Sequence, residues 1–351
     1  MSTSTPPTGR HSSAVSSTPR RRRAARAAPV VPGLAAIGLL AAACGGGSAV
    51  PKATHATGAT TTTAAAPTPV YPLTGQRITN PAMAGRPALT VKVDNVAGAF
   101  PQEGLDHADI VAEALVEGGL TRLTVTYQSQ DAALVGPIRS ARPVDAAILR
   151  ELNGGIFAYS GAANGEIAPV KASSNAVLLS HDAGSAGFQL VHWRSTPHNL
   201  FAATTDLYNV GRRAGAVWAP PPQLFQYSAS PQGGPSTQAG SATMSLSTIS
   251  TATWSWSPKS NLYFRTQNGS PDMNASGSQM SAHNVVILST AIGPTGVYDS
   301  AGNQDPLVVL VGSGQAWVMR DGRAVQGTWS RPDIASKVSL QGPGGTITLE
   351  P

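Results

Sequence analysis

The position of its only cysteine, Cys44, most constrains what this chain can fold into. One cysteine excludes an intramolecular disulfide, so the folded part depends on a hydrophobic core. The cysteine ends an uncharged stretch, residues 27–43, which follows the basic run Arg20–Arg23. This stretch contains two prolines and has 17 residues, fewer than the ~20 that a membrane-spanning helix needs. The pattern predicts an export signal peptide over residues 1–43, so we expect the fold to begin after Cys44.

Small residues before Cys44 predict that its thiol carries a lipid. The run Leu40-Ala41-Ala42-Ala43-Cys44 is similar to a lipobox, although its leucine lies one position further from the cysteine than usual. Acyl chains such as palmitate would anchor the mature protein to the outer face of the cell membrane. Two alternatives stay open, namely cleavage after Ala43 by an ordinary signal peptidase and an uncleaved anchor. Export could use either the general or the twin-arginine route.

The basic character of the chain belongs to the predicted signal peptide. The formal net charge is +6, and residues 1–43 hold six arginines and no acidic residue. Without them, 18 cationic side chains face 18 acidic ones, so the mature protein is close to neutral. We therefore expect no nucleic-acid partner, because such proteins present a basic surface.

Residues 44–70 predict a lipidated cysteine followed by a disordered tether. They consist mostly of Gly, Ser, Ala, Thr and Pro, and Lys52 is their single charged residue. Such a segment cannot bury enough apolar surface to fold. As a random coil it would span roughly 30 Å.

Beyond the tether, the pattern predicts two domains. Residues 71–222 alternate strand and helix signals, which indicates an α/β or α+β domain. Residues 223–241 are rich in Ser, Gly, Pro and Gln and predict a linker. Residues 242–351 predict a smaller, mostly antiparallel all-β domain, in which Asp321-Gly322 is a two-residue hairpin signal. We expect one further strand beyond Pro351.

The elements of the first domain follow from apolar periodicity. Strands are predicted at 88–93, 110–116, 123–127, 155–159 and 177–179, and helices at 144–152, 162–171 and 200–214. Strands of the second domain are predicted at 242–248, 252–257, 261–266, 284–291, 307–311, 315–319 and 323–325.

Several ordered motifs resemble the DUF3048 family of YerB-type lipoproteins. The similarity covers about 71–351, and its motifs are Tyr71–Gly75, Val91–Asn95, Gly104–Asp109, Glu113–Gly119, Thr121-Arg122, Gly136–Arg142, Pro197–Asn199, Asn284–Val286, Gly312–Gly314 and Gly327–Trp329. The resemblance implies a two-domain envelope lipoprotein and no particular biochemical activity.

Two glutamates and two arginines are the first candidate site residues. Glu113 and Glu117 lie four positions apart, a spacing that can place two carboxylates on one face. Arg139 and Arg142 flank Ser140 before a predicted helix, and such a helix start with arginines nearby can bind an anion. The alternative is an internal network in which these arginines form salt bridges with the two glutamates.

Further candidates lie in the other motifs. Asp94-Asn95 ends a predicted strand and could face a ligand or form an Asx turn. His198 could be a general base or a ligand contact, or Asn199 could cap the helix predicted from Leu200. Arg122, from the Thr121-Arg122 motif, is the last of the candidate ligand-binding residues.

These candidates support three hypotheses. The first is a non-enzymatic lipoprotein that binds an anionic ligand, such as a cell-wall component, or an envelope protein through an Arg/Glu/Asp/His cleft. The second is a cell-wall hydrolase that uses the glutamate pair with His198, and the third is a scaffold for a membrane enzyme. The histidine spacing predicts no metal site, and no motif predicts a cofactor. The tryptophans Trp254, Trp256, Trp317 and Trp329 are expected to pack in the β domain.

Overall fold

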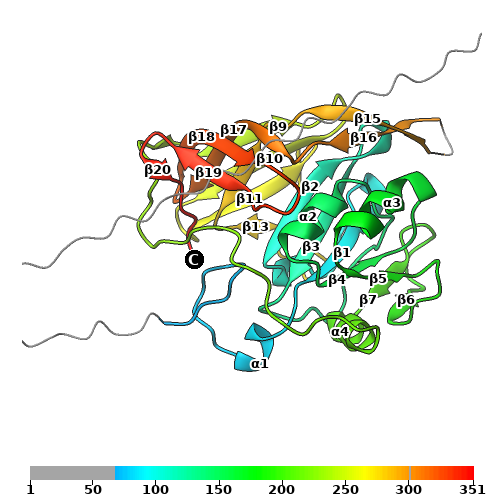
Figure 1. Cartoon of the computed structure of the whole chain (residues 1–351). Helices are drawn as coiled ribbons and strands as arrows, with labels where there is room; N and C mark the ends of the chain where they lie inside the picture. Colours follow the sequence, from blue (N-terminus) through cyan, green and yellow to red (C-terminus); the bar gives the residue numbers. More distant parts are fainter. Residues whose placement is uncertain (1–67, 300–301) are drawn as a thin grey trace, which may run out of the picture. The chain divides into compact units, whose positions relative to one another are not determined.

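The computed structural model describes residues 68–299 and 302–351 (Figure 1). The predicted signal peptide, Cys44 and nearly all of the predicted tether lie outside the described residues. Within the described ranges, no helix combines the length and apolar character needed to cross a membrane.

A mixed five-stranded sheet forms the centre of the N-terminal half. Its strand order is β2-β3-β1-β4-β5, with β1 antiparallel to β3 and parallel to β4. The central strands are buried on both faces: β4 is apolar throughout, whereas β1 and β3 alternate apolar residues with polar ones that are also buried. The strands are β1 (Leu89–Asp94), β2 (Ile110–Leu115), β3 (Thr121–Tyr127), β4 (Ile156–Tyr159) and β5 (Val177–Ser180).

Helices cover both faces of this sheet. Alternate residues of β4 point to opposite sides, so Phe157 joins the core beneath α2 and α3, and Ile156 joins the core beside α4. This layering confirms the predicted α/β class. The helices are α1 (Pro81–Ala84), α2 (Asp145–Glu151), α3 (Asn164–Ser173) and α4 (Thr204–Arg213), with 3-10 turns η1 (Ala97–Ala99), η2 (Leu105–His107) and η3 (Glu117–Gly119).

The helix predicted over 200–214 begins four residues later than expected. Leu200–Ala202 is a strand, β7, which pairs with β6 (Phe188–Leu190), a strand that the sequence pattern did not reveal. The three residues are buried, and Ala202 exchanges backbone hydrogen bonds with Val135. Tertiary pairing therefore overrides helical periodicity here, and Asn199 does not cap a helix.

The C-terminal half is all-β, as predicted. One sheet has the order β12-β11-β10-β9 with β13 beside β11, and a second has the order β14-β17-β18-β19-β20 with β8 beside β18. β15 and β16 form a separate hairpin. The bounds are β8 (Thr237–Gln238), β9 (Ser241–Ser245), β10 (Thr251–Ser257), β11 (Leu262–Gln267), β12 (Ser270–Pro271), β13 (Ser281–Ala282), β14 (Val285–Leu288), β15 (Ile292–Tyr298), β16 (Gln304–Val308), β17 (Gly312–Arg320), β18 (Arg323–Arg331), β19 (Ser339–Gly342) and β20 (Gly345–Thr346).

The predicted Asp321-Gly322 turn joins β17 to β18. Both residues have positive φ, 53° and 68°, as a two-residue hairpin of the mirror-image type requires. Trp329 on β18 is 1% exposed, consistent with the packing role expected for it.

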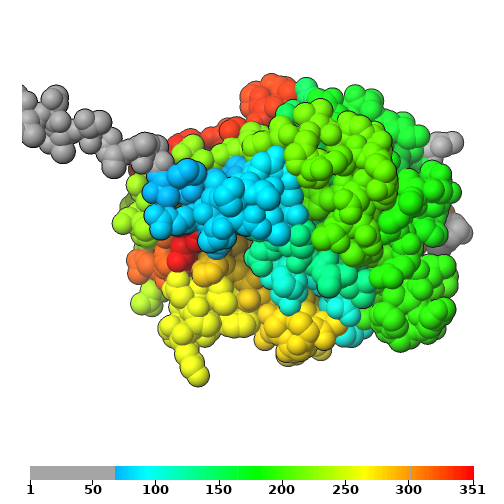
Figure 2. Space-filling view, turned by 90° about the horizontal axis from the view of Figure 1, so that it is seen from below, coloured from blue at the N-terminus to red at the C-terminus, as the bar shows by residue number. Residues whose placement is uncertain are grey.

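The two halves are in direct contact. The Tyr227 hydroxyl donates to the Leu73 carbonyl, and Arg331 donates to the Ala147 carbonyl at 2.9 Å. Figure 2 shows the N-terminal segment (blue) lying against later parts of the chain (yellow to red) on one face. Side chains of the later residues thus donate to backbone carbonyls of the first half.

Candidate functional site

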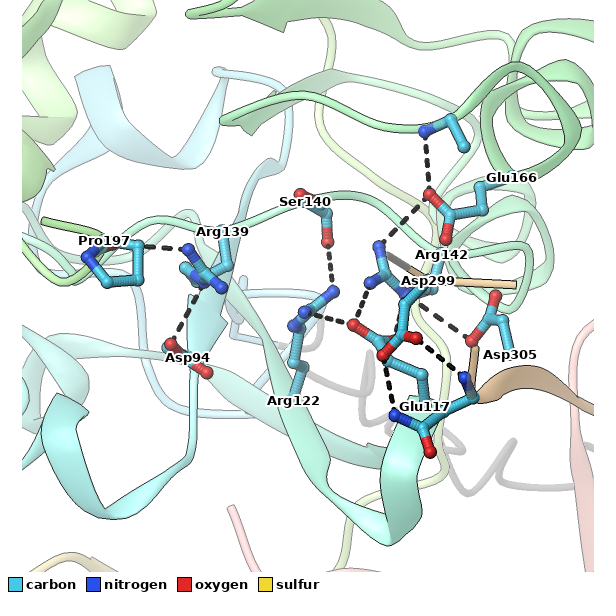
Figure 3. Close-up of polar contacts among 12 residues, drawn as sticks. Asp94, Glu117, Arg122, Arg139, Ser140, Arg142, Glu166, Pro197, Asp299 and Asp305 are labelled. Atoms are coloured by element: carbon cyan, nitrogen blue, oxygen red, sulfur yellow. Dashed lines mark hydrogen bonds and ion pairs between the residues drawn. The ribbon is translucent and has the colours of Figure 1, made fainter. Parts of the chain in front are cut away.

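The predicted site residues separate into three polar groups rather than one. We call them the Asp94 centre (Asp94, Arg139, His198), the Arg142 cluster (Glu117, Arg122, Arg142, Glu166, Asp305) and the Arg265 cluster (Asn95, Glu113, Thr121, Arg265, Asp272). Figure 3 shows the Arg142 cluster and, on the other side of Ser140, Asp94 and Arg139 of the Asp94 centre.

Two arginines share one carboxylate in the Arg142 cluster. Arg122 Nη2 donates to Glu117 Oε1 at 2.6 Å, and Arg142 Nε donates to Glu117 Oε2 at 2.7 Å. Burial alone would raise the pKa of Glu117, but the Arg142 hydrogen bond and the two positive charges lower it. The bidentate geometry makes this group a buried ion-pair network, one of the two arrangements that the sequence left open.

Two more carboxylates reach the same cluster from other elements. Glu166 at the start of α3 accepts from Arg142 Nη1 at 3.3 Å and from the Ala163 amide at 2.8 Å. Asp305 on β16 lies 3.5 Å from Arg142 Nε and is 1% exposed. Sequence reasoning missed Asp305 because the second domain contributes it.

Asp305 is the poorly satisfied member of the Arg142 cluster. Neither of its carboxylate oxygens has a hydrogen-bond partner among the described residues. Burial raises its pKa to about 7, although the charge of Arg142 opposes this. The cluster contains three carboxylates against two guanidinium groups, so holding one proton brings its charge into balance.

The Arg265 cluster links the two halves. Arg265 on β11 is 1% exposed and donates to both oxygens of Glu113 on β2, at 2.9 and 2.8 Å. The same carboxylate accepts from the Asn95 side chain at 3.0 Å and from the Thr121 hydroxyl at 2.8 Å. Arg265 also forms a short ion pair with Asp272. These contacts indicate that the cluster holds the halves together.

The two glutamates consequently belong to different networks. Glu113 points from β2 toward Arg265, whereas Glu117 lies in η3, where the chain turns through Gly118 and Gly119 at φ 65° and 75°. Left-handed backbone at two successive positions strongly favours glycine, which explains this sequence pair. Because arginine holds each carboxylate, neither glutamate is free to act as an acid or base.

The Asp94 centre is more open than the other two groups. Asp94 ends β1, and its Oδ2 lies 3.1 Å from both Arg139 Nε and His198 Nδ1. The Asp94 side chain is 2% exposed, whereas the side chains of Arg139 and His198 are 25% and 22% exposed. A buried carboxylate thus orients two nitrogen-bearing groups whose outer parts remain accessible.

The backbone holds the Asp94 centre in place. The Arg139 amide donates to the Lys92 carbonyl at 2.9 Å, and Asn95 donates its amide to Asp94 Oδ1 at 3.0 Å. Gly98 packs against the imidazole, since a Cβ added there would lie 2.7 Å from His198 Nε2. Position 98 must therefore be small if the histidine is to keep its orientation.

Two predicted residues stand beside the centre without joining it. Ser140 contributes its carbonyl, which accepts from Arg122 at 3.4 Å, and its hydroxyl lies 3.4 Å from that of Ser160. Asn199 closes the loop before β7 through its carbonyl, which accepts from the Val191 amide at 2.9 Å. No group of three or more metal-ligating side chains occurs in the described ranges.

A buried lysine was not among the predicted residues. Lys92 on β1 donates to Asp145 at 2.7 Å and to Thr124 at 2.9 Å, with both charged side chains fully buried. Burial lowers the pKa of Lys92, and Asp145 opposes that change. The sequence signal that could have revealed its burial is its place between two valines of a central strand.

The fold and its polar groups define a class of protein: an α/β domain joined to an all-β domain by buried arginine–carboxylate networks. The chain belongs to the DUF3048 family. Residues 73–216 match "Protein of unknown function (DUF3048) N-terminal domain", and residues 242–351 match the corresponding C-terminal domain. The family resemblance seen in the sequence is confirmed.

A relative from Bacillus subtilis matches this chain both in sequence and in solved structure. The chain is 31% identical over 144 residues to "Putative lipoprotein YerB" of strain 168, which is 41% of this chain and 43% of that protein. The crystal structure of the YerB protein superposes with a TM-score of 0.66 at 24% identity, covering 80% of this chain and 93% of that one. This structural likeness confirms the fold class.

Proposed function

We propose that this protein is a lipid-anchored binding protein on the outer face of the cytoplasmic membrane, and that the Asp94 centre receives an anionic group. The sequence before Cys44 and the lipoprotein name of its relative support the anchor. The ligand is a carboxylate or phosphate group carried by an envelope component.

The exposure of Arg139 is the observation that carries the site. The side chains of Arg122, Arg142 and Arg265 are 7%, 6% and 1% exposed and are saturated by carboxylates. Arg139 is one-quarter exposed and forms an ion pair with Asp94, and its side-chain hydrogen bond to the Pro197 carbonyl is long at 3.4 Å. Its guanidinium therefore keeps donors for a planar anion, with His198 alongside as a second contact.

The hydrolase hypothesis has less support from the geometry. Its glutamate pair is divided between the Arg142 and Arg265 clusters, and each carboxylate forms an ion pair with arginine. A binding role requires only the donors that the Asp94 centre presents.

Calorimetric titration of the full-length protein in detergent tests the site. We expect orthophosphate or acetate to bind with Kd of roughly 1 mM, and Arg139→Gln to weaken binding by about tenfold. The control is Arg213→Gln, which changes an exposed arginine at the end of α4. Tighter binding of orthophosphate would indicate that the ligand is a phosphate-bearing polymer or headgroup. Tighter binding of acetate would indicate a ligand that carries carboxylate groups. Equal binding by the Arg139 variant and the wild type would refute the site.

Fractionation of cells that express Cys44→Ser tests the anchor separately. We expect the variant to appear in the medium while the wild type stays in the membrane fraction. Membrane retention of the variant would exclude lipidation as the anchor, and it would leave the titration result unaffected.

A further inference from the structure

A pocket next to the loop before β7 belongs to none of the three polar groups. Its volume is about 440 Å³, within the range of ~300–1,000 Å³ common for small-molecule sites. It is lined by Phe100, Pro101, Glu103, Trp193, Arg194 and Ala275. Both halves of the chain therefore contribute to its wall.

The indole of Trp193 is exposed but held in place. Its residue is 67% exposed, the highest value for any tryptophan of the chain. Its ring centroid lies 6.5 Å from that of Phe201, which is fully buried. Hydrogen bonds from Val191 to Asn199 and from His198 to Ser195 close the loop that carries it. An exposed aromatic ring on a fixed loop is typical of a binding surface.

Two oppositely charged side chains complete the pocket. Arg194 donates to the carbonyls of Ala99, at 3.0 Å, and Pro101, and its guanidinium lies 5.7 Å from the Phe201 ring centroid. The Glu103 backbone is fixed to Gly136 by an amide hydrogen bond of 2.9 Å. Burial raises the pKa of the Glu103 carboxyl, with Arg194 opposing. The lining thus offers both hydrogen-bond donors and acceptors without a net charge.

We infer that this pocket binds the pyranose ring of an uncharged glycan, stacked on Trp193 and hydrogen-bonded by Glu103 and Arg194. A sugar ring has an apolar face that suits a flat indole and hydroxyl groups that suit a carboxylate beside a guanidinium. The Glu103 carboxylate would repel a strongly anionic ligand. Binding to an anionic membrane surface would require an excess of basic residues, which this lining lacks. The inference does not depend on the Asp94 centre.

Fluorine NMR of the full-length protein in detergent, labelled with 5-fluorotryptophan, tests this assignment. The six tryptophans give separate probes, and Trp193→Phe identifies the resonance of interest. The ligands are tetramers of β-1,4-linked N-acetylglucosamine and of α-1,4-linked glucose. The matched control is Trp218→Ala, because Trp218 is also exposed but packs 3.7 Å from the Arg212 guanidinium outside this pocket.

We expect one tetramer to shift the Trp193 resonance with Kd of roughly 1 mM. Trp193→Ala should weaken that binding by about tenfold as measured by calorimetry, and Trp218→Ala by less than about twofold. Either of two results would overturn the assignment. One is no shift of the Trp193 resonance with both tetramers at ~10 mM. The other is a shift caused only by phosphatidylglycerol mixed into the detergent micelles, which would make Trp193 a membrane contact.

Discussion

Replacing Asp305 by asparagine should remove a pH-dependent contribution to stability. In the Arg142 cluster this carboxyl is 1% exposed, lacks hydrogen bonds from the described residues, and has a pKa raised by burial to about 7. Asparagine has nearly the same shape but cannot ionise. The variant therefore reproduces the protonated state of Asp305 at every pH.

The sign of the effect follows from the direction of the pKa change. Folding raises the pKa of Asp305 from 3.8 to about 7, so the folded state holds the proton more tightly than the unfolded state. The contribution is fully present below pH 3.8 and is lost as the pH rises through about 7. Between pH 6 and pH 8 the free energy of unfolding should fall by about 1.4 kcal/mol from this group alone.

Urea denaturation at pH 6, 7 and 8 measures this difference. The wild type should lose about 1.4 kcal/mol relative to Asp305→Asn across this range, and the difference between the two proteins should persist at pH 6 and close only toward pH 3.8. The control is Asp182→Asn, since the Asp182 side chain is 67% exposed. Amide hydrogen exchange in β15 and β16 should show the same loss of stability. In the wild type, but not in Asp305→Asn, the opening equilibrium of these strands should be about tenfold more favourable at pH 8 than at pH 6.

A constant stability difference between wild type and Asp305→Asn from pH 6 to pH 8 would refute this reasoning. It would mean that Asp305 stays ionised in the fold, so that Arg142 compensates its burial completely. The excess negative charge assigned to the Arg142 cluster would then be wrong.

Three further substitutions test other parts of the structure. Lys92→Met should destabilise the protein by about 3–5 kcal/mol in urea titrations, because it leaves the buried Asp145 carboxylate without its cationic partner. Adding Asp145→Asn should recover part of this loss, and no recovery would contradict the pairing. Gly98→Ala should displace the imidazole of the Asp94 centre and weaken orthophosphate binding by about tenfold, whereas unchanged affinity would remove that imidazole from the site. Gly314→Ala should lower the free energy of unfolding by about 1–3 kcal/mol, because its Cβ would lie 2.6 Å from the Trp329 indole nitrogen. The control Gly240→Ala places its Cβ in open space and should change the free energy of unfolding by less than about 0.5 kcal/mol. Equal effects of the two substitutions would contradict the packing.

Local sequence patterns predicted most of the secondary structure. The strands β1 to β5 and the helices α2 and α3 lie where apolar periodicity placed them, because each buries one face or both. The Asp321-Gly322 turn was predictable because positive φ at two positions strongly limits residue choice. Leu200–Ala202 was mispredicted, since its strand pairing with Phe188–Leu190 depends on a partner that periodicity does not show.

Candidate residues were predictable by type but not by partner. Charged residues around Gly118-Gly119 and before α2 marked a polar region, and the Glu117–Arg142 contact was among the arrangements expected. Arg265 lies more than 140 positions from Glu113, and Asp305 lies more than 140 positions from Arg142. Because such pairs form only when the two domains pack together, spacing along the chain cannot reveal them.

The sequence by itself determined the strands β1 to β5 and the helices α2 and α3, the α/β and all-β composition of the two domains, the predicted export signal with its cysteine, and the polar residues at the strand ends. Only the tertiary structure decided which of those residues are neutralised inside ion pairs and which, like Arg139 and His198, keep an exposed surface. The physical reason is that burial and pairing of a charge depend on neighbours in space, whereas backbone preference depends on neighbours in the chain.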